Sequence, residues 1–223
     1  MRSLFKKILF PVLKSAYKIY SSKERSYSYK GINISIVPGV FHPGLFFSTK
    51  LLIEYISKYD LNDKNVLELG AGSGLISVYC SKNKAIVTAS DINPTAVENI
   101  NENAKLNSVN IKVVESDLFY RIEMRKFDYI IINPPYFPKN PNNEEEFAWF
   151  CGSDFQYFRK LFDQIGNYVN NDSKIIMVLS EDCEIEIIKK IGEQSLFVLT
   201  KCYEQKILGE MNYIFEISKT NIV

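Results

Sequence analysis

The spacing of hydrophobic residues along the chain switches repeatedly between the pattern of a buried strand and that of an amphipathic helix. From residue 65 onward, short apolar runs alternate with segments in which apolar positions recur every three or four residues. Runs of the first kind are typical of strands buried on both faces, and the intervening segments of helices that cover such a sheet. The predicted strands are 65–70, 85–91, 111–117, 127–133 and 174–180, and the predicted helices are 73–82, 94–105, 153–169 and 184–192. This alternation predicts an α/β fold with a mostly parallel sheet and helices on both faces.

The two ends of this alternation follow a different pattern. After the last predicted helix, the apolar runs 196–204 and 206–218 follow each other with no helical segment between them, so they should pair as an antiparallel hairpin. Upstream, residues 49–58 predict a further helix, and the alternation on either side of Lys30 and Gly31 predicts a small hairpin. The main sheet should therefore contain seven strands.

The first 30 residues differ in charge from the rest of the chain. They hold eight Lys or Arg residues against one Glu, whereas the remainder holds 19 bases and 25 acids. Residues 1–20 place apolar positions on one helical stripe and lysines on the others, although Pro11 interrupts this pattern. We therefore divide the chain into a basic amphipathic N-terminal segment, 1–30, and one domain, 31–223. The segment either packs on the protein's own core or docks on a substrate or a membrane surface.

Composition narrows the class of protein. Of 223 residues, 46% are apolar and 24% are charged, which is typical of a soluble globular protein, and no apolar run is long enough to span a bilayer. The four cysteines lack the close pairing of metal ligands, and the chain has a single histidine, so we expect no metal site. Buried free thiols in a reducing cytoplasm are the expected state of these cysteines, and the expected location is cytoplasmic, with peripheral membrane association as an option.

A glycine-rich turn follows the first strand of the alternation. The stretch ELGAGSG, residues 68–74, leads from that strand into a helix, at the sheet edge where α/β proteins bind ligands. Leu75 stands where the dinucleotide fingerprint requires glycine, and no lysine follows to make a phosphate-binding loop. Asp91 ends the next strand and can accept hydrogen bonds from both hydroxyls of a ribose, or serve as an anion at a helix start. Asp117 ends the third strand, where it either accepts from an adenine amino group or forms a turn.

Together with the sequence Asn133-Pro134-Pro135-Tyr136, these features resemble the class I S-adenosylmethionine-dependent methyltransferases. The resemblance covers about residues 38–217 and implies a Rossmann-like sheet with S-adenosyl-L-methionine as cofactor. It implies that Thr49, Glu68 and Gly70 contact the methionine end of the cofactor. The full set of cofactor-binding residues that it implies is Thr49, Glu68, Gly70, Ala71, Gly72, Gly74, Asp91, Ile92, Asp117, Leu118 and Asn133.

The Asn-Pro-Pro-Tyr motif is similar to that of enzymes that methylate planar nitrogens. An amide-like NH₂ group is a poor nucleophile because its lone pair is delocalised, so the enzyme must orient it. The resemblance assigns catalysis to Asn133, Pro134 and Tyr136. The Asn133 Oδ1 atom and the Pro134 carbonyl can each accept one N–H of the substrate, and Tyr136 can stack on the planar group.

Two further segments are similar to the HemK/PrmC-type enzymes and to the related methyltransferase small domain enzymes. They are 38–56, before the cofactor strand, and 146–155, after the motif, although Cys151 and Phe155 stand where glycines are usual. PrmC-type enzymes also have a helical N-terminal domain that docks the release factor, for which this chain has too few residues. Short eukaryotic-type relatives lack that domain too and use a partner subunit. Trp149 should be a packing anchor, and 142–146 a solvated loop near the substrate mouth.

Three functions remain open from the sequence. The preferred hypothesis is N-methylation of a protein side-chain amide, glutamine, because the acidic domain is a poor phosphate binder. The alternative is methylation of an adenine or guanine amino group in rRNA, tRNA or DNA, for which residues 1–30 would supply positive charge. The third is a non-catalytic cofactor-binding module that the basic segment tethers to a membrane. In each of the first two, the methyl acceptor is a macromolecule.

Overall fold

The computed structural model describes residues 20–220, so the amphipathic helix predicted for residues 1–20 falls almost entirely outside the described range. The division of the chain at residue 30 stays a prediction. Strands β1 (Arg25–Tyr29) and β2 (Ile32–Ile36) pair antiparallel, which confirms the predicted hairpin. Tyr27 and Tyr29 of β1 pack against the core of the following domain.

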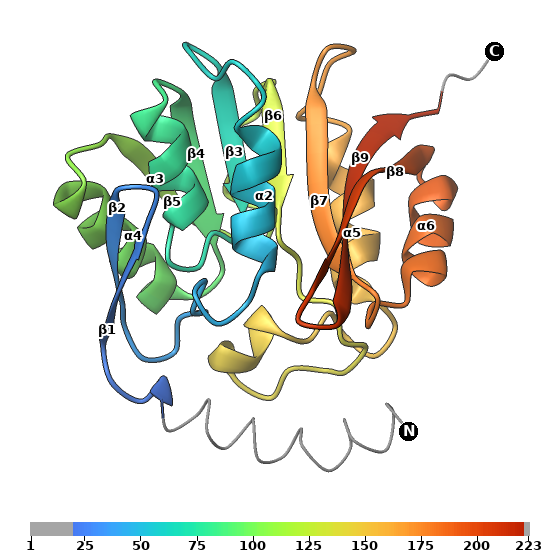
Figure 1. Cartoon of the computed structure of the whole chain (residues 1–223). Coiled ribbons are helices and arrows are strands. Elements are labelled where there is room, and N and C mark those ends of the chain that lie inside the picture. The colour runs from blue at the N-terminus through green and yellow to red at the C-terminus, as the bar shows by residue number, and fades with distance from the viewer. Residues whose placement is uncertain (1–19, 221–223) are drawn as a thin grey trace.

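The main sheet has seven strands in the order β5-β4-β3-β6-β7-β9-β8. The first five of this order run parallel, and β9 is antiparallel to both β7 and β8. Their bounds are β3 (Asn65–Leu69), β4 (Ile86–Asp91), β5 (Ile111–Glu115), β6 (Tyr129–Ile132), β7 (Lys174–Ser180), β8 (Phe197–Ile207) and β9 (Glu210–Lys219). The predicted sheet, with its antiparallel C-terminal hairpin, is thereby confirmed (Figure 1).

Helices cover both faces of the sheet. Successive side chains of a strand point to opposite faces, so the apolar strands present apolar side chains on each face. In β6, Tyr129 and Ile131 join the core under one set of helices, whereas Ile130 and Ile132 join the core on the opposite face. The helices of the first face are α2 (Ser48–Ile56), α3 (Leu75–Lys82) and α4 (Pro94–Leu106). Those of the second face are α5 (Gln156–Ile165) and α6 (Ile185–Gln194).

Two helices begin later than the sequence predicts, and in both cases the backbone gives the reason. Helix α3 begins at Leu75, not 73, because Gly74 has φ of 75° and helical geometry starts only after it. Helix α5 begins at Gln156, not 153, because Phe155 has φ of 55°, in the left-handed region, and cannot belong to a right-handed helix. The predicted loop 142–146 contains the start of a short 3-10 helix, η1 (Glu144–Ala148).

The cysteines match the expectation in part. All four are free thiols, and Cys80, Cys151 and Cys183 are buried, but Cys202 is exposed on β8. From residue 200 onward, the side chains of β8 are exposed or half-buried. Among residues 20–220, no helix combines the length and the apolar composition needed to cross a bilayer.

Candidate active site

A pocket of about 1010 Å³ opens at the carboxyl ends of the parallel strands. It lies where the strand order reverses direction: from β3 the chain moves outward to β4 and β5, then returns to place β6 on the other side of β3. Loops after strands on the two sides of such a switch point diverge and leave a crevice between them. The glycine-rich turn after β3 and the Asn-Pro-Pro-Tyr segment after β6 both line this crevice.

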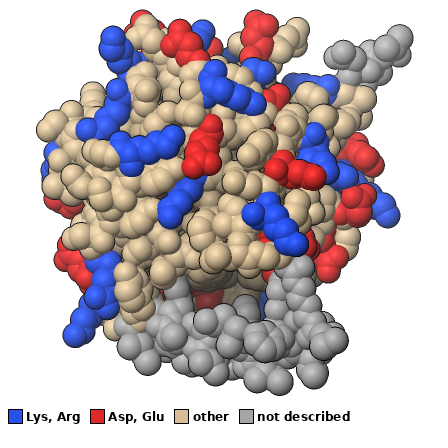
Figure 2. Space-filling view, in the orientation of Figure 1, with Lys and Arg blue, Asp and Glu red and all other residues tan. Residues whose placement is uncertain are grey.

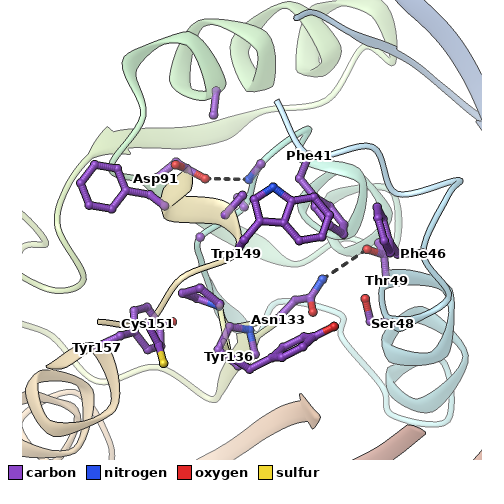
Figure 3. A pocket seen from close by; sticks show the side chains of 18 of the residues that line it. Phe41, Phe46, Ser48, Thr49, Asp91, Asn133, Tyr136, Trp149, Cys151 and Tyr157 are labelled. Atoms are coloured by element: carbon purple, nitrogen blue, oxygen red, sulfur yellow. Dashed lines mark hydrogen bonds between the residues drawn. The ribbon is translucent and has the colours of Figure 1, made fainter. Parts of the chain in front are cut away.

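The glycine-rich turn wraps tightly around the end of β4. Gly70, Gly72 and Gly74 have φ of 67°, 54° and 75°, a region that side chains with a Cβ rarely adopt. The N–H of Gly72 donates to Oδ2 of Asp91 at 2.8 Å, and the N–H of Asn93 donates to Oδ1 of the same carboxylate at 2.9 Å. These bonds fix the Asp91 carboxylate beside the turn, as Figure 3 shows, and burial raises its pKa.

Glu68 is a buried acid beneath the turn. Its Oε2 atom accepts a hydrogen bond from the Ser77 backbone N–H at 2.8 Å and another from the Ser77 hydroxyl. Burial raises the pKa of Glu68 to about 8, an effect that the hydrogen bonds from Ser77 oppose and the nearby charge of Asp91 reinforces. The side chain lines the pocket, so it can meet a cationic group of a ligand there.

Asn133 follows β6 directly and lies at the centre of the pocket wall. Its Nδ2 atom donates to the Thr49 hydroxyl oxygen, in the first turn of α2, at 3.5 Å. Among the described residues, no donor contacts Asn133 Oδ1, so this oxygen remains available in the pocket (Figure 3). Asn133 follows the last residue of a central strand, because β6 (Tyr129–Ile132) lies between β3 and β7 in the sheet.

Tyr136 is largely buried beside Asn133. Burial raises the pKa of its hydroxyl, the carboxylates of Glu210 and Asp182 raise it further, and a hydrogen bond with the Ser180 side chain lowers it. Its ring centroid lies 4.7 Å from that of Phe137. The ring therefore forms a fixed, neutral surface of the pocket.

An aromatic wall covers the pocket opposite Asn133. The rings of Phe41 and Phe46 stack with centroids 4.8 Å apart, and the Trp149 ring lies 5.4 Å and 5.0 Å from them (Figure 3). Trp149 is thus a packing anchor, as predicted, and also lines the pocket. Neither phenylalanine was predicted as a site residue, although the density of aromatic residues in segment 41–47 is a visible signal.

Asp117 lies in the loop after β5 and lines the pocket. It is exposed and forms an ion pair with Lys160 of α5. Leu118 follows it, buried and with φ of 51°. Leu118 and Lys160 line the pocket together with Asp117.

The structure brings nearly all sequence-predicted site residues into this one pocket. The residues that line it are Thr49, Glu68, Gly70, Ala71, Gly72, Asp91, Ile92, Asp117, Leu118, Asn133, Pro134 and Tyr136. Gly74 does not line it. This glycine lies against α4, where an added Cβ would meet Ile100 at 3.0 Å, so its observed role is in packing the turn.

The space beside the glycine-rich turn suits the cofactor that the sequence implies. An atom added at the Cβ position of Gly70 would meet nothing within 4 Å, so the turn borders open space. A carboxylate on each side, Glu68 and Asp91, can bind an ammonium group and ribose hydroxyls respectively. Among residues 20–220, no cluster of His, Cys, Asp or Glu could hold a metal ion.

Relatives of this chain are methyltransferases. A family model described as the methyltransferase small domain matches residues 31–189. A protein of Methanocaldococcus jannaschii that carries the name protein N5-glutamine methyltransferase is 37% identical over 169 residues, which is 73% of this chain and 83% of the relative. The release factor glutamine methyltransferase of Aquifex aeolicus is 39% identical over 98 residues, 41% of this chain and 35% of that one.

Solved structures share the fold. The ribosomal protein L11 methylase of Lactobacillus delbrueckii has a TM-score of 0.62 at 20% identity, with 83% of this chain and 84% of that chain covered. The E. cuniculi Mtq2–Trm112 complex, which methylates the termination factor eRF1, has a TM-score of 0.62 at 22% identity, with 82% of this chain and 99% of that chain covered. Because the family model spans most of the domain and the archaeal relative matches along most of both chains, this chain belongs to the methyltransferase small domain family and is an S-adenosylmethionine-dependent methyltransferase.

Proposed function

We propose that the protein transfers a methyl group to the side-chain amide nitrogen of a glutamine in a protein. The observation that carries this proposal is the state of Asn133, whose Nδ2 atom is bound to Thr49 while Oδ1 is left for a ligand. An acceptor oxygen in this position suits a substrate NH₂ group. The name of the 37% identical archaeal relative supports glutamine as the source of that group.

The residues around Asn133 supply orientation and charge stabilisation. S-adenosylmethionine, when bound, would supply a sulfonium methyl group that a nucleophile can attack, with the thioether S-adenosylhomocysteine as the leaving group. The Asn133 Oδ1 atom and the Pro134 carbonyl each accept one N–H of the substrate amide, which directs the nitrogen lone pair along the axis of transfer. As the nitrogen gains positive charge, both acceptors stabilise it, and the excess proton leaves to water. Tyr136 packs on the planar amide.

The cofactor would lie along the edge formed by β3, β4 and β5. Glu68 would contact the methionine ammonium, Asp91 the ribose hydroxyls, and Asp117 with Leu118 the adenine. The cofactor contact that the resemblance implies for Thr49 stays a prediction. Because its hydroxyl accepts from Asn133 Nδ2, we assign Thr49 to positioning of the Asn133 amide.

A nucleic-acid substrate is the alternative, and solved relatives of that kind exist. The T. thermophilus 16S rRNA methyltransferase RsmC, solved with AdoMet and guanosine, has a TM-score of 0.61 at 16% identity. Against this alternative, acidic and basic side chains are interspersed on the face shown in Figure 2, without a continuous basic surface for phosphates. The mixed charge of this face therefore favours a protein substrate.

The test uses radiolabelled S-adenosylmethionine and a lysate of cells that lack this protein. Wild-type enzyme should transfer label into material that protease removes and RNase leaves intact. Asn133→Ala should bind the cofactor with nearly unchanged Kd in calorimetry, but lose transfer by two or more orders of magnitude, roughly the effect of a lost transition-state acceptor. Label that is lost to RNase and survives protease would refute the protein substrate.

A further inference from the structure

The mouth of the pocket is apolar on three sides. Leu45, before α2, is 42% exposed, Phe147 of η1 is 39% exposed, and Leu208, in the turn between β8 and β9, is 90% exposed. All three line the same pocket that holds Asn133, although they come from widely separated parts of the chain. Figure 1 shows η1 and the β8–β9 turn at the same end of the sheet. Exposed apolar side chains that converge around a pocket are typical of a protein-binding surface.

The charge of this mouth is negative. Glu144 of η1 and Glu210 of β9 line it, and within the described part of the chain neither has a salt-bridge partner. Lys160 is the one cation among the described lining residues, and it is already paired with Asp117. Glu210 lies close enough to Tyr136 to influence its hydroxyl, so this negative charge is adjacent to the acceptor site.

From these features we infer the sequence context of the methyl acceptor. Resting on the proposed function, the inference is that the target glutamine lies in a protein loop between an apolar residue and a Lys or Arg. The apolar residue contacts Leu45, Phe147 and Leu208, and the base pairs with Glu144 or Glu210. A phosphate backbone would meet these two carboxylates without a free cation from the described lining, which is unfavourable for nucleic acid.

The negative charge of the mouth should act on binding of the acceptor. An exposed ion pair is a weak contact, but replacing both carboxylates by cations also adds repulsion, so the affinity for a basic segment should fall roughly tenfold. This contribution acts on binding of the protein segment and not on the cofactor, because neither Glu144 nor Glu210 belongs to the glycine-rich turn or to the strand ends β4 and β5. Reversal of these charges should therefore raise KM for the acceptor and leave Kd for S-adenosylmethionine unchanged.

The test identifies the methylated glutamine in the labelled lysate and then measures KM for peptides that contain it. Mass spectrometry locates the methylated glutamine in the labelled protein, and peptides are made with its native flanks and with each flanking base changed to Glu. The KM of wild-type enzyme is compared with that of the double variant Glu144→Lys, Glu210→Lys, both on these peptides and on the whole protein. The control is Glu98→Lys, Glu102→Lys on α4, which makes the same change in net charge on exposed residues that do not line the pocket.

The inference expects a base and an apolar residue beside the methylated glutamine, and a roughly tenfold higher KM for the Glu144, Glu210 variant on the native protein. The peptide with its flanking base changed to Glu should have a lower KM with that variant than with wild type. The Glu98, Glu102 control should have the KM of wild type on the native protein. A glutamine without a basic neighbour, or equal KM for the variant and wild type, overturns the inference while the proposed function stands. Label found in RNA alone overturns the proposed function itself, and the inference with it.

Discussion

Glu68 makes the stability of the cofactor-free protein depend on pH in a direction opposite to that of most carboxylates. The side chain is 4% exposed, and burial raises its pKa from 4.5 to about 8. An acid with a raised pKa in the folded state keeps its proton there, whereas the unfolded chain gives it up. Unfolding therefore releases a proton between these two pKa values, and the free energy of unfolding decreases as pH rises through that window.

The magnitude follows from the width of the window. Each pKa unit corresponds to about 1.4 kcal/mol, so the full shift from 4.5 to about 8 corresponds to roughly 5 kcal/mol. Glu68→Gln removes the ionisation but keeps an oxygen that can accept from the Ser77 N–H. Between about pH 6 and about pH 8, the variant should therefore gain roughly 2 kcal/mol in stability relative to wild type.

Urea denaturation of both proteins without cofactor, followed by circular dichroism at about pH 6 and about pH 8, measures this difference. Glu98→Gln, an exposed substitution on α4, controls for the loss of a surface carboxylate. If wild type and Glu68→Gln keep the same difference in free energy of unfolding at both pH values, Glu68 is already ionised throughout the window and the reasoning about its burial is wrong.

Three further predictions concern single residues of the site. Thr49→Val should lower kcat by roughly tenfold or more with Kd for S-adenosylmethionine unchanged in calorimetry, and Thr49→Ser should restore turnover, because only the hydroxyl orients Asn133; equal turnover of the Val and Ser variants would remove the positioning role. Asp91→Asn should weaken cofactor binding by roughly tenfold in calorimetry, since it replaces one of the two accepting oxygens of the carboxylate by an NH₂ donor, and an unchanged Kd would contradict the ribose assignment. Gly74→Ala should lower the free energy of unfolding by about 1–2 kcal/mol in urea, because φ is 75° and the new Cβ would lie 3.0 Å from Ile100; a stability equal to that of wild type would show that the turn can relax.

The sequence predicted the sheet well because its strands are buried on both faces, so their apolar runs stand out against the amphipathic helices. It predicted the cofactor edge and the Asn133 segment for a different reason, since both are contiguous motifs. The starts of α3 and α5 were wrong by two or three residues. Left-handed backbone at Gly74 and Phe155 delays each helix, and for Phe155 the residue type gives no sign of this conformation.

Of the mouth of the pocket, only the segment 142–146 was predicted from the sequence. Leu45 and Leu208 lie in loops and Phe147 in the short 3-10 helix η1, so nothing in their local pattern indicates that they share a surface. Their convergence depends on the order of strands in the sheet, which places the β8–β9 turn on the same side as η1. The hydrogen bond between Asn133 and Thr49 has the same origin, because it joins residues 84 positions apart.

The reversal of strand order between β3 and β6 divides the chain, as well as the pocket, into two parts. Residues 65–118 form one side of the crevice and contain most of the proposed cofactor contacts, whereas residues 133–210 form the other side and contain most of the proposed acceptor contacts. Donor binding and acceptor binding are thus assigned to two successive stretches of the chain. Substitutions in the second stretch can change the acceptor without altering the contacts to the methyl donor.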